Sequence, residues 1–148
     1  MTEELEFRED LIAEVKEAFS LKKVDASQYS ALALAYIGDN VYELLNRTVS
    51  VSRADKQVQK LHRECSARAN ASAQARVMKE IEPLLTEEEL RVYHRGRNAD
   101  VYTKAKNAST ADYHTATGLE ALIGFLYLMG RQKRLVELVK TGWEKADV

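Results

Sequence analysis

The sequence contains few of the residues that break or cross-link a fold. One proline (Pro83), six glycines and one cysteine (Cys65) occur in 148 residues. A single cysteine excludes an intrachain disulfide, so an oxidising compartment is not required. Scarce proline and glycine, with a hydrophobic share of 45%, favour a compact and mostly helical protein. We expect one domain over residues 1–148, in which the helix within residues 1–25 can be peripheral.

Long apolar segments and a strong net charge are also absent. No apolar run reaches about 18 residues without a charge, so we do not expect a membrane-spanning helix. The first ten residues, MTEELEFRED, lack the apolar run of a signal peptide. These absences predict a cytoplasmic protein with no membrane partner. The net charge of −1 does not by itself indicate a nucleic-acid-binding protein.

The charge is nevertheless distributed unevenly along the chain. Residues 1–25 contain eight acids and four bases, whereas residues 53–79 contain seven bases and two acids. Residues 91–106 contain five bases and one acid. Such blocks occur on solvated helix faces, and they also occur on basic surfaces that bind a polyanion. Charge alone leaves both interpretations open.

Apolar residues at helical spacing predict an all-α fold, and no alternating pattern long enough for a strand occurs. The first expected helix has one apolar face made of Phe7, Leu11, Val15, Ala18 and Phe19. The expected helices span about 4–21, a segment containing 31–45, about 52–80 with a break near Cys65, 86–96, 110–129 and 132–145.

Several residues predict where these helices begin and end. Asp25 or Ser27 offers an N-cap oxygen to the second helix. Pro83 ends the third helical region, and Thr86 with Glu89 fits a capping box. Residues 97–109 are polar and basic without periodicity, which predicts a loop. Gly130 is expected to end the helix that precedes it.

Two carboxylates stand inside the most apolar helices. Asp39 follows Gly38 in AYIGDNVY, and Glu120 lies between two glycines in TGLEALIGFLYL. Glycine inside a helix costs roughly 1 kcal/mol relative to alanine, so these glycines suggest close backbone approach. A buried carboxylate needs a partner, which can be an arginine, a helix N-terminus or a hard cation such as Mg²⁺. The spacing alone leaves these alternatives open and does not show that the two helices meet.

Four segments in order resemble the ribonuclease III catalytic domain, and most closely its short Mini-ribonuclease III branch, which has no double-stranded-RNA-binding domain. The segments are ALALAYIGDNVYEL, LHRECSARANASAQA, RGRNA and ATGLEALIGFLYL. The resemblance extends from about residue 28 to residue 138. It implies an all-α helical bundle, a single ribonuclease III-type domain.

The resemblance also implies a function. Asp39 and Glu120 match the metal-binding catalytic acids of the family, which uses Mg²⁺, with Mn²⁺ able to substitute. The family hydrolyses phosphodiesters in double-stranded RNA and leaves 5′-phosphate ends. The implied protein is therefore a homodimeric endoribonuclease, with maturation of precursor large-subunit ribosomal RNA as its role.

Some positions depart from the family pattern. Ala35 and Thr117 stand where the larger enzymes have two further carboxylates, which puts a fully occupied two-metal site in doubt. Thr117 can contribute a hydroxyl, and Glu43, one turn beyond Asp39, can give support, although a surface or dimer-contact role fits Glu43 better. His114 replaces an arginine usual in the short branch. Asn70 stands where an apolar residue is expected.

A dimer without a separate RNA-binding domain must hold the duplex with its own surface, mainly through phosphates and 2′-hydroxyls. The basic region 53–79 and the loop 95–106 supply the candidates. The residues we expect to contact RNA are His62, Arg68, Arg95, Arg97, Asn98, Lys104 and Lys106.

Two other classes of protein compete with a nuclease. The first is a non-catalytic protein on the same fold that binds double-stranded RNA or associates with the ribosome. The retained Asp39 and Glu120 argue against it, while Ala35 and Thr117 leave it open. The second is an all-α nucleotide phosphohydrolase, which needs a clustered Glu-x-x-Glu array. The acids of TEEE at 86–89 are better explained by helix capping.

Overall fold

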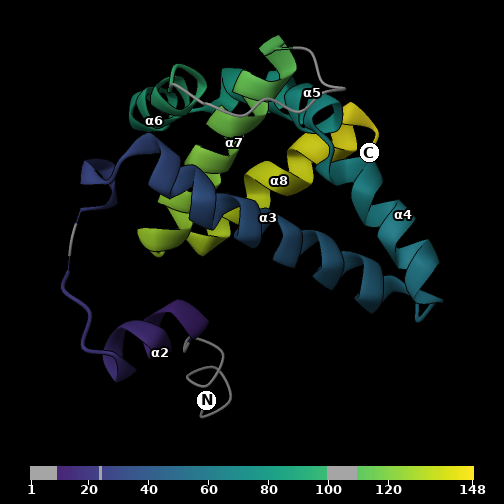
Figure 1. The fold of residues 1–148 in the computed structure, drawn as a ribbon, viewed down its shortest axis with the longest axis horizontal. Coiled ribbons are helices and arrows are strands. Elements are labelled where there is room, and N and C mark those ends of the chain that lie inside the picture. Colours follow the sequence, from purple (N-terminus) through teal and green to yellow (C-terminus); the bar gives the residue numbers. More distant parts are fainter. Residues whose placement is uncertain (1–9, 24, 100–109) are drawn as a thin grey trace.

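The computed structural model describes residues 10–23, 25–99 and 110–148, and every regular element within them is helical. The all-α prediction is confirmed. Two short 3₁₀-helices, η1 (Ala26–Gln28) and η2 (Glu82–Leu84), precede α3 and α6 respectively. The α-helices, labelled as in Figure 1, are α2 (Leu11–Ala18), α3 (Ala31–Arg53), α4 (Val58–Ala69), α5 (Ala71–Ile81), α6 (Glu87–Arg97), α7 (Thr110–Leu128) and α8 (Gln132–Ala146).

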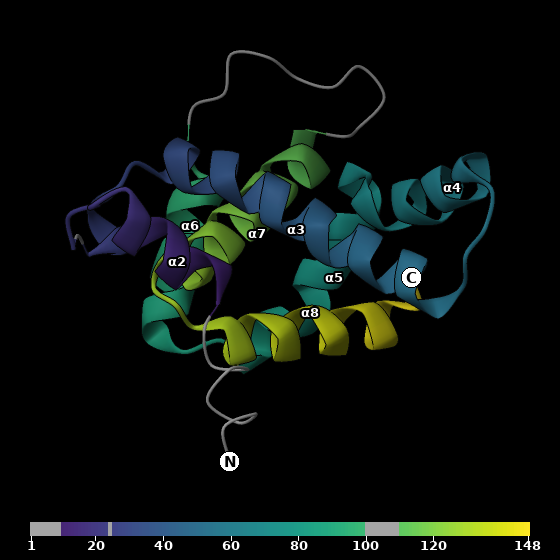
Figure 2. The ribbon, with the colours of Figure 1, turned by 90° about the horizontal axis from the view of Figure 1, so that it is seen from below.

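Helix α7 is the centre of the fold. It packs against α3, α5, α6 and α8, and it runs between them in Figures 1 and 2. Every residue from 116 to 126 except Glu120 is buried. A helix that is apolar on all sides is stable only where neighbours cover it completely, which explains this central position. Even so, no helix in the described ranges is both long and apolar enough to cross a membrane.

Helix α3 begins at a cap that we did not predict. Ser30 Oγ accepts a hydrogen bond from the Ala33 amide at 3.1 Å and is the N-cap. Asp25 instead accepts from the Ser27 amide at 2.9 Å and caps η1. The prediction of Asp25 or Ser27 as the cap of the second helix was therefore wrong, because a short 3₁₀-turn intervenes.

The third predicted helical region is two helices, and its boundaries differ from those expected. Helix α3 continues to Arg53, and α4 starts only at Val58. The break within the region lies at Asn70 and not near Cys65. Asn70 Oδ1 accepts from the Ala73 amide at 2.8 Å, so this residue is the N-cap of α5. That role explains a polar residue where an apolar one was expected.

The capping box at the start of α6 is confirmed. Thr86 Oγ1 accepts from the Glu89 amide at 3.2 Å, and Glu89 Oε1 accepts from the Thr86 amide at 2.9 Å. Glu89 is also buried and forms an ion pair with Arg134 of α8. The hydrogen bond from Arg134 is the main reason that the pKa of Glu89 is lowered. The box thus anchors α6 to α8, and Gly130, with φ of 72°, follows α7 as predicted.

Helix α2 is peripheral and ends earlier than expected. Its last residue is Ala18, and Ser20 has a left-handed φ of 50°, while residues 4–9 of the predicted helix lie outside the described ranges. Within the helix, Ile12 is the buried residue, whereas the described part of the predicted apolar face is exposed, including Leu11 at 66%. The Lys16 ammonium donates to the carbonyl of residue 128 at 2.8 Å and ties α2 to the end of α7.

Candidate active site

The site is built where α3 crosses α7 with their backbones in contact. A Cβ added to Gly38 would lie 1.7 Å from the carbonyl oxygen of Glu120, and one added to Gly124 would lie 2.0 Å from that of Leu34. Neither position can therefore hold a side chain without separating the helices. The glycines that the sequence places beside the two acids thus serve this crossing.

At the crossing, Asp39 and Glu120 face each other. Burial, a hydrogen bond with Asp39 and the negative charge of Asp39, in that order, raise the pKa of Glu120 to about 9. Near neutral pH Glu120 therefore keeps its proton. Asp39 is exposed and Glu120 is half-buried, so the pair opens to solvent on the side of Asp39.

The surroundings of the pair contain no further acid cluster. Within the described residues, no group of three or more His, Cys, Asp or Glu side chains could hold a metal ion. Ala35 and Thr117, the positions that depart from the larger enzymes, are both buried at 8% exposure. The Thr117 hydroxyl donates to the carbonyl of Tyr113 at 3.0 Å, which leaves its oxygen able to accept. Glu43 pairs with Arg47 at 3.3 Å on the surface.

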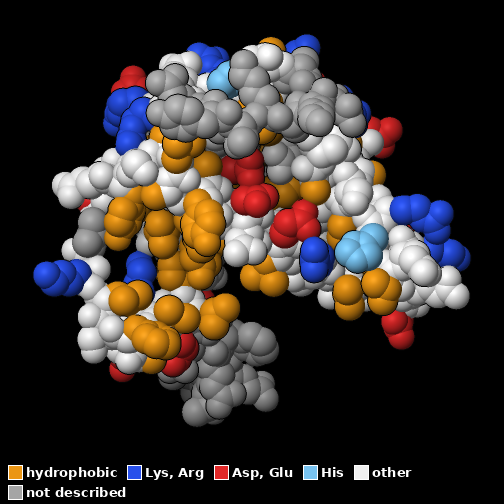
Figure 3. All heavy atoms as spheres, viewed as in Figure 1, with side chains coloured by type: hydrophobic (Ala, Val, Ile, Leu, Met, Phe, Trp, Pro, Cys, Tyr) orange, Lys and Arg blue, Asp and Glu red, His pale blue; other side chains and the backbone are white. Residues whose placement is uncertain are grey.

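The arrangement resembles half of a hard-cation site. The ionised form of Glu120 is disfavoured next to Asp39, and a divalent ion bound between the two carboxylates would offset that repulsion, since such an ion prefers oxygen ligands and retains waters. Acidic side chains lie in the middle of the face shown in Figure 3, with hydrophobic side chains to either side of them. Asp39 is exposed and Glu120 is half-buried, so a ligand can reach the pair from solvent.

The predicted RNA-contacting residues are scattered in the structure. His62 is exposed on α4, whereas Asn98 is exposed at the C-terminal end of α6. Arg97 lies beside Asn98, and its guanidinium is 5.5 Å from the ring centre of Tyr93. Arg95 is exposed, but it also donates to the carbonyls of Ser27 and Tyr29 at 2.9 and 2.8 Å. It thereby holds the turn that leads into α3. Lys104 and Lys106 lie outside the described residues.

Arg68 differs from the other predicted RNA contacts because it lies inside the protein. Its exposure is 9%, and its guanidinium donates to Asn46 and Ser50 and lies over the ring of Trp143. The fold therefore accounts for this arginine without RNA. The hydrogen-bond network around Arg68 was not predicted. The sequence did contain a signal for it, because Asn46 and Ser50 are four residues apart and therefore lie on the same face of α3.

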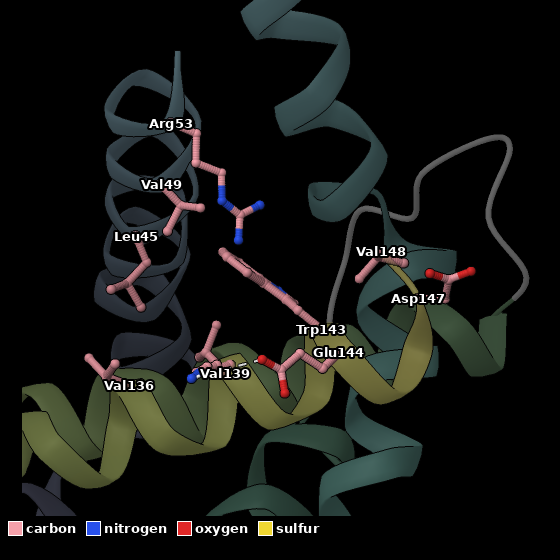
Figure 4. Close-up of a pocket in the computed structure, with 10 residues that line it drawn as sticks. Leu45, Val49, Arg53, Val136, Val139, Trp143, Glu144, Asp147 and Val148 are labelled. Atoms are coloured by element: carbon pink, nitrogen blue, oxygen red, sulfur yellow. Dashed lines mark ion pairs between the residues drawn. The ribbon is translucent and has the colours of Figure 1, made fainter.

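Two further features were missed. The Nδ1 atom of His114 is buried and has no hydrogen-bond partner among the described residues, six residues before Glu120 on α7. A mostly apolar hollow of about 310 Å³ lies between α3 and α8, with Leu45, Val49, Val139 and Trp143 among its lining residues (Figure 4). Neither Asp39 nor Glu120 lines this hollow, so it is separate from the site.

Comparison with known proteins gives consistent matches. The sequence pattern of the Ribonuclease III domain family matches residues 32–131. A protein named Mini-ribonuclease 3 from Clostridium tetani is 47% identical over 119 residues, which is 80% of this chain and 79% of that protein. Its namesake from Enterococcus faecalis is 44% identical over 117 residues, 78% of this chain and 89% of that protein.

A solved structure matches the fold as well. The crystal structure of a Fusobacterium nucleatum protein superimposes with a TM-score of 0.72 at 28% identity, covering 80% of this chain and 94% of that one.

Proposed function

The chain belongs to the ribonuclease III domain family, and on this basis we propose that it is a metal-dependent endoribonuclease in which Asp39 and Glu120 are the catalytic acids. The observation that supports this assignment best is the meeting of the two carboxylates at the glycine-lined crossing of α3 and α7. Structural acids of apolar helices pair with arginines or cap helices, whereas these two face each other.

The donor set fits Mg²⁺, with Mn²⁺ able to substitute. Asp39 and Glu120 would hold the ion, while Thr117 and water offer further oxygens. When bound, such an ion supplies Lewis-acid activation of water and neutralises charge that develops on the phosphate. With only two protein carboxylates, we expect most remaining ligand positions to be filled by water and by the phosphate of the substrate.

The protein residues have distinct tasks in this proposal. Glu120 must release its proton before both carboxylates can bind a cation, and its raised pKa makes that step sensitive to pH. Asp39, which is exposed, faces the side from which the duplex approaches. Gly38 allows α3 and α7 to approach closely enough for the two acids to act together.

We propose that the active form is a homodimer, in which two sites related by a two-fold axis each cut one strand. The support is the apolar surface beside the site. Tyr36 is 83% exposed and Leu32 is 42% exposed on α3, one to two turns before Asp39. Exposed apolar patches of this kind mark interaction surfaces.

The RNA surface is proposed to include His62, Arg97 and Asn98, together with Lys104 and Lys106 from the segment outside the described residues. Arg95 belongs to it through its exposed position, in addition to its bonds to the turn before α3. Arg68 is left out because its guanidinium is bonded inside the protein. The class of substrate, precursor large-subunit ribosomal RNA in the cytoplasm, rests on the family resemblance.

Cleavage of a long RNA duplex tests the proposal against its rival. The expected products are short duplexes with 5′-phosphate ends, formed with Mg²⁺ and not with EDTA. A protein that binds the duplex but leaves it intact under all divalent ions would instead be the non-catalytic RNA-binding or ribosome-associated protein. Cleavage that continues in EDTA would contradict the metal assignment alone.

A further inference from the structure

Helix α4 lies at one side of the molecule, beside the C-terminal part of α3 (Figures 1 and 2). It packs mainly against α3 and continues into α5, and its buried residues are Cys65 and Arg68. Val58 at its start is 66% exposed. Few apolar side chains of α4 are buried, so polar contacts can contribute much to the angle between α4 and α3.

Five hydrogen bonds join the buried side of α4 to one stripe of α3, and the weakest of them runs from the Cys65 thiol to Ser50 Oγ at 3.6 Å. Arg68 Nη1 donates to Asn46 Oδ1 at 2.8 Å and to Ser50 Oγ at 3.0 Å. The Tyr42 hydroxyl donates to the carbonyl of Arg68 at 2.7 Å, and Asn46 Nδ2 donates to the carbonyl of Cys65 at 2.8 Å. The three α3 residues are spaced one turn apart, so they form a continuous polar track.

The guanidinium of Arg68 is held from a second direction by α8. It lies over the Trp143 ring, 4.9 Å from the centroid, and the Trp143 indole N–H donates to the Tyr42 hydroxyl at 2.9 Å. None of the ion pairs between described residues includes Arg68. The guanidinium is hydrogen-bonded to neutral acceptors on α3 and stacked on an aromatic ring of α8, and its charge also acts on the Glu64 carboxylate. Contacts from two helices fix its direction, because a planar guanidinium fork fits few geometries.

The solvent side of α4 carries cations. Lys60 and Arg63 are exposed, and together with Lys56 and Glu64 they line a shallow hollow. Lys56 forms an ion pair with Glu64, whereas no ion pair between described residues includes Lys60 or Arg63. A change in the angle of α4 would move these free cations relative to the rest of the surface.

We propose that Arg68 is a positioning residue that sets the angle at which α4 presents Lys60 and Arg63 to an RNA duplex lying over the catalytic acids. This inference rests on the proposed function. Its partners Tyr42 and Asn46 lie on α3 within two turns of Asp39, so the angle of α4 is fixed relative to the catalytic helix itself. Arg68 acts through α4 and does not touch RNA.

The first experiment measures the angle of α4 without RNA. Trp143 is the sole tryptophan and Cys65 the sole cysteine. A Cys65→Ser, Lys60→Cys protein labelled with a dansyl-type acceptor therefore reports the distance from α8 to α4 by energy transfer. Arg68→Met should lengthen and broaden the distance distribution, and Ser50→Ala, which removes one acceptor, should do so to a smaller degree. An unchanged distribution in both variants would overturn the proposal.

The second experiment measures duplex binding by unlabelled protein, in an Asp39→Asn background that prevents cutting. Arg68→Met should weaken binding roughly tenfold, and Lys60→Gln with Arg63→Gln should weaken it as well. Because both changes act on the same contacts, the combined variant should lose less than the product of the two effects. Independent, multiplicative losses would contradict a positioning role.

The catalytic rate supplies a further readout that general destabilisation would not produce. In the wild-type background, Arg68→Met should raise the duplex concentration for half-maximal cleavage but change the rate at saturation by about twofold at most. If Arg68→Met fails to fold in urea-denaturation controls, Ser50→Ala decides the outcome in both experiments.

The two proposals fail in different ways. A wild type that binds no duplex, with an α4 angle that depends on Arg68, would refute the nuclease function and leave the positioning of α4 intact. A wild type that cuts duplex, with neither angle nor binding altered in the Arg68 and Ser50 variants, would refute the positioning role alone.

Discussion

The carbonyl oxygen of Glu120 lies where a side chain on residue 38 would begin, 1.7 Å from the position of a Cβ. Gly38 and Glu120 are therefore in backbone contact, and Asp39, the next residue along α3, is brought to the Glu120 carboxyl. Packing and the proposed catalysis depend on the same contact, because the surface that joins α3 to α7 also places the two acids together.

Replacing Gly38 by alanine should damage stability and activity together. The added methyl must push α3 from α7, and overpacking of this kind costs about 1–3 kcal/mol. Urea denaturation and single-turnover cleavage measure the two effects. The matched control is Gly130→Ala, where the φ of 72° costs roughly 1 kcal/mol but nothing lies within 4 Å of the new Cβ. Equal loss of cleavage in both variants would contradict the role of the crossing.

Neutral replacement of either acid should abolish most cleavage while duplex binding persists. Loss of outer-shell partners alone typically reduces activity by about 10–100-fold, so Asp39→Asn and Glu120→Gln should each lose at least about a hundredfold. Single-turnover assays with excess enzyme measure the rate. Glu137→Gln, an exposed acid on α8, is the control and should cut normally. Normal cutting by either site variant would remove that residue from the catalytic centre.

The stability of the metal-free protein should fall with rising pH because of Glu120. Its pKa is about 9 in the folded protein and near 4.5 when unfolded, so between these values the folded state binds more protons. The free energy of unfolding therefore decreases as pH rises, by at most about 1.4 kcal/mol per unit. Glu120→Gln should remove this slope and become the more stable protein at pH 8.

Urea denaturation in EDTA across this pH range measures the slope, with Glu137→Gln as the control that should retain it. Mg²⁺ should stabilise the wild type increasingly as pH rises, because its binding displaces the proton of Glu120. A wild type and a Glu120→Gln variant with parallel pH profiles would show that the pKa of Glu120 is not raised in the folded protein.

Neutralising Arg97 and Lys104 should weaken duplex binding and flatten its dependence on salt. Each phosphate contact that is lost should reduce the logarithmic salt slope by about one. Fluorescence anisotropy at several salt concentrations measures affinity and slope together. Lys133→Gln, an exposed lysine on α8, should change neither quantity. An unaltered slope in the double variant would place the RNA surface elsewhere.

A charge at Tyr36 should dissociate the proposed dimer. Tyr36 is 83% exposed, so Tyr36→Lys should leave the fold of one chain intact while it opposes apolar contact between two. Size-exclusion chromatography with light scattering should show a shift toward monomer at equal concentration. Val136→Lys, at 49% exposure on α8, is the matched control and should leave the mass unchanged. A wild type that is already monomeric would contradict the proposed homodimer.

Local signals in the sequence predicted those parts of the fold that depend on neighbouring residues. The capping box of Thr86 and Glu89 was correct because both bonds form within one turn. The central place of α7 follows from its apolar composition. The predicted break near Cys65 was misplaced, and the true break lies at Asn70. Asn70 is recognisable as an N-cap only once α4 and α5 are known to be separate helices.

Contacts between segments far apart in the sequence were harder to predict. The glycines beside Asp39 and Glu120 indicated close approach, but only the fold shows that they face each other across one crossing. Arg68 is the clearest failure of local reasoning. In a basic segment it had the character of a surface residue, yet its guanidinium is enclosed by Asn46, Ser50 and Trp143 from two other helices.

The central position of α7 has a consequence for how the chain folds as it is made. Helix α7 begins more than fifty residues after the end of α3, so the ribosome must synthesise that segment before α3 can pack against α7. At a translation rate of about 5–20 residues per second, the surface of α3 that packs against α7 stays exposed for several seconds. Until then the nascent chain lacks Glu120, one of the two proposed catalytic acids, and exposes much of its future core. The active centre is thus among the last parts of the protein that can assemble during translation.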